Sequence, residues 1–176
     1  MGFELFDHID VNVYAKEAAR TAKTMLDAPP CPAGTMPVIL DNGFGGVLFH
    51  EACGHGLEAT SVAKGQSVFC HKLGEQIAAP CVSAVDDGTL PGEWGSLSID
   101  DEGHPTKRNL LIENGVLTGY MIDRLGSRRM EMPRPGNARR QSYRFEPTSR
   151  MTNTFLLPGH GSVEALIADT PEGLYA

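Results

Sequence analysis

The sequence contains no hydrophobic run long enough to cross a bilayer. A membrane-spanning helix needs about 20 consecutive apolar residues, and no stretch of the 176 residues comes near this. The first four residues, Met1-Gly2-Phe3-Glu4, lack the basic start and apolar stretch of a signal peptide. The four cysteines form no C-x-x-C pair, so we expect reduced thiols in a cytoplasmic protein. These absences exclude a membrane span and a secreted disulfide miniprotein.

The composition that remains is that of a folded domain. Hydrophobic residues make up 41% and charged residues 21% of the chain, enough to bury a core. The 20 glycines and 12 prolines make the sequence turn-rich but not of low complexity. Because the last residues, Gly173-Leu174-Tyr175-Ala176, are partly apolar, we expect the sequence to be a fragment of a longer protein.

Charge is distributed unevenly along the chain. The net charge of −7 disfavours general attraction to nucleic acid. Eight of the ten arginines, but only two acidic residues, lie from Arg124 to Arg150, which gives this segment a charge of +6. A solvated surface explains such a run as well as a binding site does. Arginine in preference to lysine favours carboxylate or phosphate recognition, because the planar guanidinium makes bidentate contacts.

Hydrophobic periodicity predicts an α+β domain. Residues 11–27 are predicted to form an amphipathic helix, which ends before Pro29. Asn114-Gly115 predicts a tight hairpin turn within 109–120, and Ser162 is predicted to cap a helix over 163–168. Further strands are predicted over 38–40, 67–70, 82–85, 96–99 and 154–157, and a short helix over 121–130. We therefore expect a mainly antiparallel, barrel-like sheet with a few flanking helices.

The strongest chemical signal is an H-E-x-x-x-H motif formed by His50, Glu51 and His55. On an ideal α-helix, residues at i and i+5 lie roughly 140° apart and cannot share a metal. A π-bulge would return both imidazoles to one face, and we expect Gly54 and Gly56 to permit its unusual backbone angles. Glu51 would then lie beside a water molecule at the metal and act as general base.

Other polar residues have simpler explanations. Cys53 lies inside the motif, but its spacing directs it away from the histidine pair, so packing is the favoured role. The acidic pairs at 86–87 and 100–101 precede turns, which explain them better than a metal site or acid–base chemistry does. A metal site could in principle be completed by Cys70 with His71, by Cys81, by His104 or by His160, but each of these is more often an ordinary structural residue.

Several motifs in order resemble the TldD/PmbA family of cytosolic metalloproteases. They are residues 43–59 (GFGGVLFHEACGHGLEA), 85–89 (VDDGT), 99–103 (IDDEG), 112–115 (IENG), 136–143 (GNARRQSY) and 150–154 (RMTNT). The resemblance covers nearly the whole chain and is far more specific than the histidine pair alone. It divides the chain into an N-terminal helix and linker (1–35) and part of a metalloprotease catalytic domain (36–176), without the family's N-terminal domain and extreme C-terminal part.

The resemblance implies a zinc-dependent peptidase that acts on small or unfolded peptides. His50 and His55 inherit the role of zinc ligands, and Glu51 inherits that of the residue that activates water. The family's third zinc ligand is a cysteine far downstream, with no match here, so we expect the fragment to bind zinc weakly and to be inactive alone. We expect a homo- or hetero-dimer with a related chain.

The arginine-rich motif suggests where a peptide binds. Arg139, Arg140 and Tyr143 are predicted to line the substrate cleft and to hold the peptide carboxylate or backbone. Two other functions stay open. The first is a non-catalytic companion subunit, which the intact motif disfavours. The second is a regulator associated with DNA gyrase, since family members have been described as gyrase modulators; here nucleic acid is the less favoured partner and a membrane is not expected.

Overall fold

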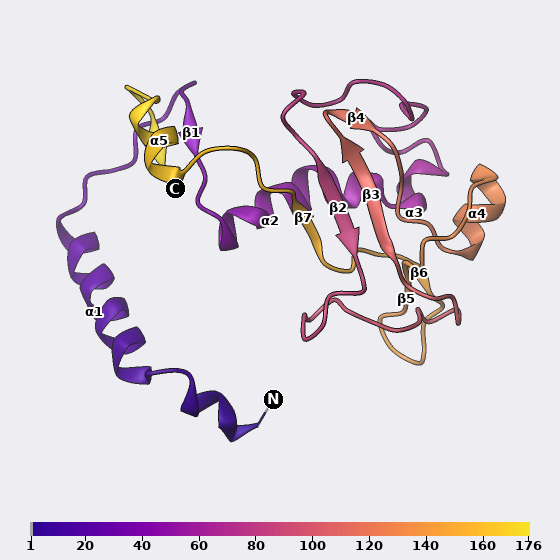
Figure 1. Cartoon of the computed structure of the whole chain (residues 1–176), viewed down its shortest axis with the longest axis horizontal. Coiled ribbons are helices and arrows are strands. Elements are labelled where there is room, and N and C mark those ends of the chain that lie inside the picture. The colour runs from indigo at the N-terminus through magenta and orange to yellow at the C-terminus, as the bar shows by residue number, and fades with distance from the viewer. Residues whose placement is uncertain (1) are drawn as a thin grey trace. The chain divides into compact units, whose positions relative to one another are not determined.

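The computed structural model describes residues 2–176, except for the side chain of Phe44, and the chain divides into two units (Figure 1). The first unit ends at Met36. It contains a short 3-10 turn, Phe3–Asp7, and the helix α1, Val11–Asp27. Asp10 caps α1 by accepting a hydrogen bond from the backbone N–H of Asn12 at 2.9 Å. The predicted helix over 11–27 is therefore confirmed.

The second unit, Pro37–Ala176, is built around a four-stranded antiparallel sheet. Its strand order is β4-β3-β2-β7, with β2 at Ala84–Asp87, β3 at Arg108–Glu113, β4 at Val116–Leu117 and β7 at Thr154–Leu156. Two small sheets accompany it: β1 (Val38–Ile39) pairs in parallel with β8 (Leu174–Tyr175), and β5 (Ala138–Arg139) pairs antiparallel with β6 (Thr148–Ser149). The α+β class is confirmed, and within residues 2–176 the sheet stays open and does not close into a barrel.

The β3–β4 hairpin turns as its sequence predicts. Asn114 and Gly115 both adopt positive φ angles, 51° and 82°, as a type I′ turn requires. A side chain at Gly115 would also overlap with the amide of Gln76, so the position is restricted by packing as well as by φ.

Two predicted strands are wrong. Residues 67–70 form a turn, in which the Ser67 hydroxyl accepts the Phe69 N–H at 3.1 Å and donates to the Gly56 carbonyl at 2.6 Å. Residues 96–99 are irregular, with a single bridge between Ile99 and Pro105. Both segments have strand-like composition but no neighbouring strand to complete a hydrogen-bond ladder.

Within its described residues, the second unit also contains four α-helices. They are α2 (Gly46–Phe49), α3 (Ala59–Val62), α4 (Arg124–Met130) and α5 (Val163–Ala168). The Ser162 hydroxyl accepts the Ala165 N–H at 3.2 Å, which confirms the predicted cap of α5. The segment that carries the motif, α2 and the residues after it, packs against the edge strand β7. No helix of the described chain is both long and apolar enough to span a membrane.

The core lies between the sheet and the segment that follows the motif. It consists of Leu57, Ala59, Val62, Ala84, Leu111, Ile112, Leu117, Tyr120, Met121, Ile122 and Met151. Leu57 and Met121 are fully buried, and their backbones are joined by a hydrogen bond from the Met121 N–H to the Leu57 carbonyl at 3.0 Å. The residues immediately after the motif are therefore anchored in the centre of the domain.

The acidic pairs predicted to precede turns contain aspartates that accept several hydrogen bonds each. Asp86 is 1% exposed and accepts bonds of 2.6–2.8 Å from the Asn137 amide, the Thr152 N–H and hydroxyl, and the Thr154 hydroxyl. Asp100 is also buried and accepts three backbone N–H groups. Structural roles account for both carboxylates, as the sequence indicated.

Candidate metal centre

The H-E-x-x-x-H motif forms a turn of π-helix over His50–Gly54, followed by a 3-10 turn over His55–Leu57. The His55 N–H donates to the His50 carbonyl, which is the i to i+5 bond that defines a π turn. The predicted bulge is therefore present, between α2 and α3.

The glycines in and after the motif allow close packing, and Gly54 does not show the unusual backbone angles that we expected. Gly54 has ordinary helical angles, φ −54° and ψ −55°, so the π turn demands no special backbone freedom there. Instead, a Cβ at Gly54 would overlap with the sulfur of Met151. A Cβ at Gly56 would lie 2.9 Å from the ring of Phe69. Both glycines allow other segments to approach the motif closely.

The π turn brings the three motif side chains into one cluster. The imidazole centroids of His50 and His55 are 4.7 Å apart, with the ring planes at 89°. The Nε2 atoms of both rings lie 4.0 Å from carboxylate oxygens of Glu51. One ligand atom from each residue falls within 4.8 Å of the other two. All three side chains are partly exposed, so the cluster is open on one side.

This donor set fits a zinc ion. Two neutral imidazoles suit zinc, and a catalytic site keeps one position open for water and substrate. No other histidine, cysteine or acidic residue of the described chain joins the cluster, and this includes Cys53. Burial raises the pKa of the Cys53 thiol, as expected for a packed and unreactive cysteine.

Sequence reasoning missed Glu58, which lies directly behind the cluster. Its carboxylate is 3.2 Å from Nδ1 of His55 and 3.7 Å from Nη1 of Arg150. Burial raises the pKa of Glu58, while His55, Arg150 and the backbone of Met151 oppose the shift. The i, i+3 spacing from His55 to Glu58 was a visible signal, whereas nothing local points to Arg150.

The residues predicted to bind substrate lie outside this cluster. Arg139, on β5, donates to the carbonyl of Met151 at 3.3 Å. The backbone N–H of Arg140 donates to Asp101, and Tyr143 is 80% exposed. Of the arginine-rich segment, it is Arg150 that reaches the motif, through Glu58. The substrate role of Arg139, Arg140 and Tyr143 stays a prediction.

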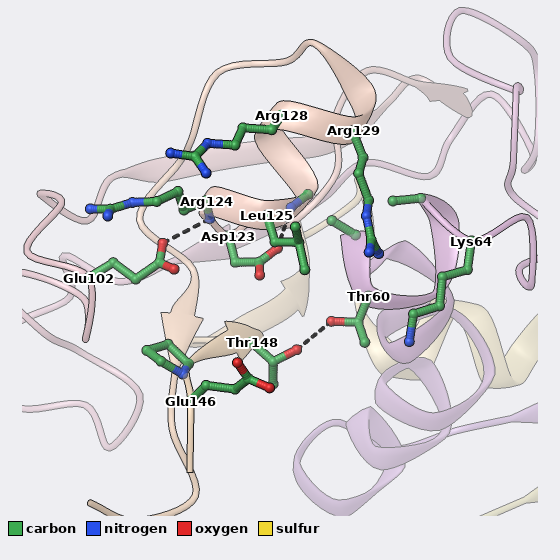
Figure 2. Close-up of a pocket in the computed structure, with 14 residues that line it drawn as sticks. Thr60, Lys64, Glu102, Asp123, Arg124, Leu125, Arg128, Arg129, Glu146 and Thr148 are labelled. Carbon is green, nitrogen blue, oxygen red and sulfur yellow. Dashed lines mark hydrogen bonds between the residues drawn. The ribbon is translucent and has the colours of Figure 1, made fainter.

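A pocket of 410 Å³ lies beside the motif segment, between α3, α4 and β6 (Figure 2). It begins at Ala59 and Thr60, which directly follow Glu58, and the Thr60 hydroxyl bonds to that of Thr148 at 2.6 Å. Its basic residues are Lys64, Arg124, Arg128 and Arg129, none of which forms an ion pair within the described chain. Three acids, Glu102, Asp123 and Glu146, line the same pocket, so its lining is mixed in charge.

A glutamate flanked by two histidines on a helical turn, open to solvent and packed on an α+β domain, defines a metallopeptidase-type site. Residues 33–176 match the PmbA/TldA metallopeptidase C-terminal domain. The chain therefore belongs to the PmbA/TldA metallopeptidase family.

Individual relatives agree with this assignment. The chain is 48% identical over 175 residues to a metalloprotease TldD homolog of Haemophilus influenzae. The alignment includes 99% of this chain and 36% of that relative. It is 34% identical over 177 residues to a zinc metalloprotease TldD homolog of Saccharolobus solfataricus, in an alignment that includes 99% of this chain and 39% of that relative. The chain thus spans little more than a third of these relatives.

Solved structures show the same fold. The crystal structure of a proposed modulator of a DNA gyrase from Thermotoga maritima superposes with a TM-score of 0.73 at 30% identity, covering 84% of this chain and 33% of that one. The crystal structure of TldE from Thermococcus kodakarensis gives a TM-score of 0.70 at 26% identity, over 79% of this chain and 32% of that one.

Proposed function

We propose that the chain is part of a zinc-dependent peptidase that hydrolyses small or unfolded peptides. One observation carries the proposal: the π turn gathers His50, Glu51 and His55 into a single open cluster. A straight α-helix would separate the histidines. The relative named as a zinc metalloprotease supports zinc as the metal.

His50 and His55 would hold the metal through their Nε2 atoms, which face Glu51. When bound, zinc supplies a Lewis acid that polarises the peptide carbonyl and lowers the pKa of water. Glu51 accepts the proton of the attacking water and delivers it to the leaving amine. Its 65% exposed side chain is free to turn toward a substrate.

The rest of the proposal follows the family resemblance. A third zinc ligand would come from a cysteine downstream of this chain, and a related chain would complete a dimer. The peptide would be held by Arg139, Arg140 and Tyr143. Neither a membrane nor nucleic acid is proposed as a partner.

Zinc calorimetry on this chain and on the full-length protein tests the proposal. We expect weak binding by residues 1–176, tight binding by the full-length protein, and loss of tight binding in His50→Ala and His55→Ala. The exposed His160 provides a matched control, since His160→Ala removes an imidazole outside the cluster. Glu51→Gln should retain zinc yet lose about 10²–10⁴-fold of peptide hydrolysis, measured with short quenched-fluorescence peptides.

Tight binding by residues 1–176 alone would mean that a third ligand lies within them. A full-length protein that binds no zinc would contradict the proposal and favour the companion-subunit interpretation.

A further inference from the structure

The backbone of Glu58 is held rigidly at the end of the motif. Its φ and ψ angles, −78° and 132°, are extended, so the chain leaves the helical turn at this residue. The residues on either side are tied to Met121, by the Met121 N–H to Leu57 carbonyl bond at 3.0 Å and the Ala59 N–H to Met121 carbonyl bond at 2.8 Å. Since Met121 is fully buried in the core, Glu58 cannot move without disturbing it.

The side chain of Glu58 is equally constrained. The residue is 5% exposed, and its two carboxylate oxygens face different partners, His55 Nδ1 at 3.2 Å and Arg150 Nη1 at 3.7 Å. The backbone of Arg150 is held in turn by Asn137, whose carbonyl accepts the Arg150 N–H at 2.8 Å and whose amide donates to the Arg150 carbonyl at 2.9 Å. The buried carboxylate therefore lies between His55 and Arg150.

A carboxylate at Nδ1 determines which nitrogen of an imidazole carries the proton. The Glu58 carboxylate at 3.2 Å favours the His55 tautomer that carries its proton on Nδ1, and this tautomer leaves the Nε2 lone pair available on the side of Glu51. His50 has no hydrogen-bond partner for its ring within the described residues, apart from the 4.0 Å approach of Glu51. The two histidines thus differ: one is oriented before metal arrives and the other is not.

We propose that Glu58, held by Arg150, is a positioning residue that orients His55 for the metal through the Nδ1 hydrogen bond. The inference rests on the proposed metal site and deepens it, because it assigns a role to a buried acid outside the H-E-x-x-x-H motif. It also connects the arginine-rich segment to the site through the Arg150–Glu58 ion pair.

The decisive variant is Glu58→Met, which preserves the approximate volume but removes the acceptor. Removing one partner of a fully buried ion pair is destabilising, because it leaves the other charge buried. The Arg150 side chain is 44% exposed, so water can solvate its guanidinium once the carboxylate is gone, and the fold should persist. Glu58→Gln is the rescue variant, because its amide oxygen can still accept from Nδ1. The matched control is Glu102→Met: Glu102 is another largely buried acid that pairs with an arginine, Arg134, at 3.6 Å.

Two readouts are needed. Zinc affinity is measured by chelator competition in the full-length protein, and the His55 tautomer is measured by ¹H–¹⁵N correlation in the metal-free 176-residue chain. We expect Glu58→Met to weaken zinc binding about 10–100-fold and to convert His55 from one tautomer to a mixture. Glu58→Gln should restore most of both properties, and Glu102→Met should change neither.

Unchanged zinc affinity in Glu58→Met, or an unchanged His55 tautomer, would overturn the inference. An equal loss of affinity in Glu102→Met would also overturn it, since it would show a general effect of lost stability. If the parent protein binds no zinc at all, the proposed function fails, and the tautomer measurement decides separately whether Glu58 orients His55.

Discussion

Removing the carboxylate of Asp86 should destabilise the domain by about 4 kcal/mol. Its two oxygens accept from the Asn137 amide, the Thr152 N–H, and the hydroxyls of Thr152 and Thr154. In Asp86→Ala the hydroxyls can rotate toward other acceptors, but the Thr152 N–H and one N–H of the Asn137 amide cannot. Two buried donors left unsatisfied cost about 1–3 kcal/mol each.

Urea unfolding followed by far-UV circular dichroism measures this effect. The single tryptophan, Trp94, is 98% exposed, so its fluorescence would report unfolding poorly. Thr154→Val removes one donor and preserves shape, and should cost about 1 kcal/mol. Asp169→Ala, at an exposed aspartate, should fall within about 0.5 kcal/mol of the parent.

A loss below about 1 kcal/mol for Asp86→Ala would refute this reasoning, because it would mean that the donors find other partners at little cost. A change in the urea dependence of the unfolding free energy, rather than in the midpoint alone, would instead indicate an altered denatured state.

Two further predictions concern packing and pH. Gly54→Ala should destabilise the domain by about 1–3 kcal/mol and weaken zinc binding, because the new Cβ displaces Met151. The control is Gly46→Ala: a Cβ there would have no atom within 4 Å, so this variant should be neutral or slightly stabilising in thermal melts. Burial raises the pKa of Tyr120 above its usual 10.0, and its hydroxyl donates to the Phe69 carbonyl at 2.7 Å. The folded state therefore favours the neutral phenol, so the stability that Tyr120 contributes is complete below pH 10.0 and is lost as pH rises through the raised pKa. Urea midpoints across this range should fall less steeply in Tyr120→Phe.

Equal melting temperatures for the two glycine variants would contradict the packing explanation. If the urea midpoints of the parent and of Tyr120→Phe fall equally with rising pH, groups other than Tyr120 cause the loss of stability at alkaline pH.

Much of the local structure was predictable. The helix α1, the cap at Ser162 and the hairpin turn at Asn114-Gly115 all formed where expected. The π turn was also predicted, because two histidines five residues apart can meet only if the helix is wider there. These features depend on hydrogen bonds between residues close in sequence.

The predictions that failed depended on distant neighbours. Residues 67–70 and 96–99 have the composition of strands, but a strand exists only where another segment supplies its hydrogen bonds. The assumed reason for Gly54 was wrong as well, since its requirement comes from Met151 and not from its own backbone angles.

The sequence by itself therefore determined the family, the H-E-x-x-x-H motif, the bulge that brings its histidines together, and the helices and turn around it. Only the tertiary structure decided which groups support that motif. Glu58 meets Arg150, and Asp86 meets Asn137 and Thr154, across long separations in the chain. Such contacts arise when the sheet and the motif segment bury a shared core, and burial turns these carboxylates into groups that must find donors.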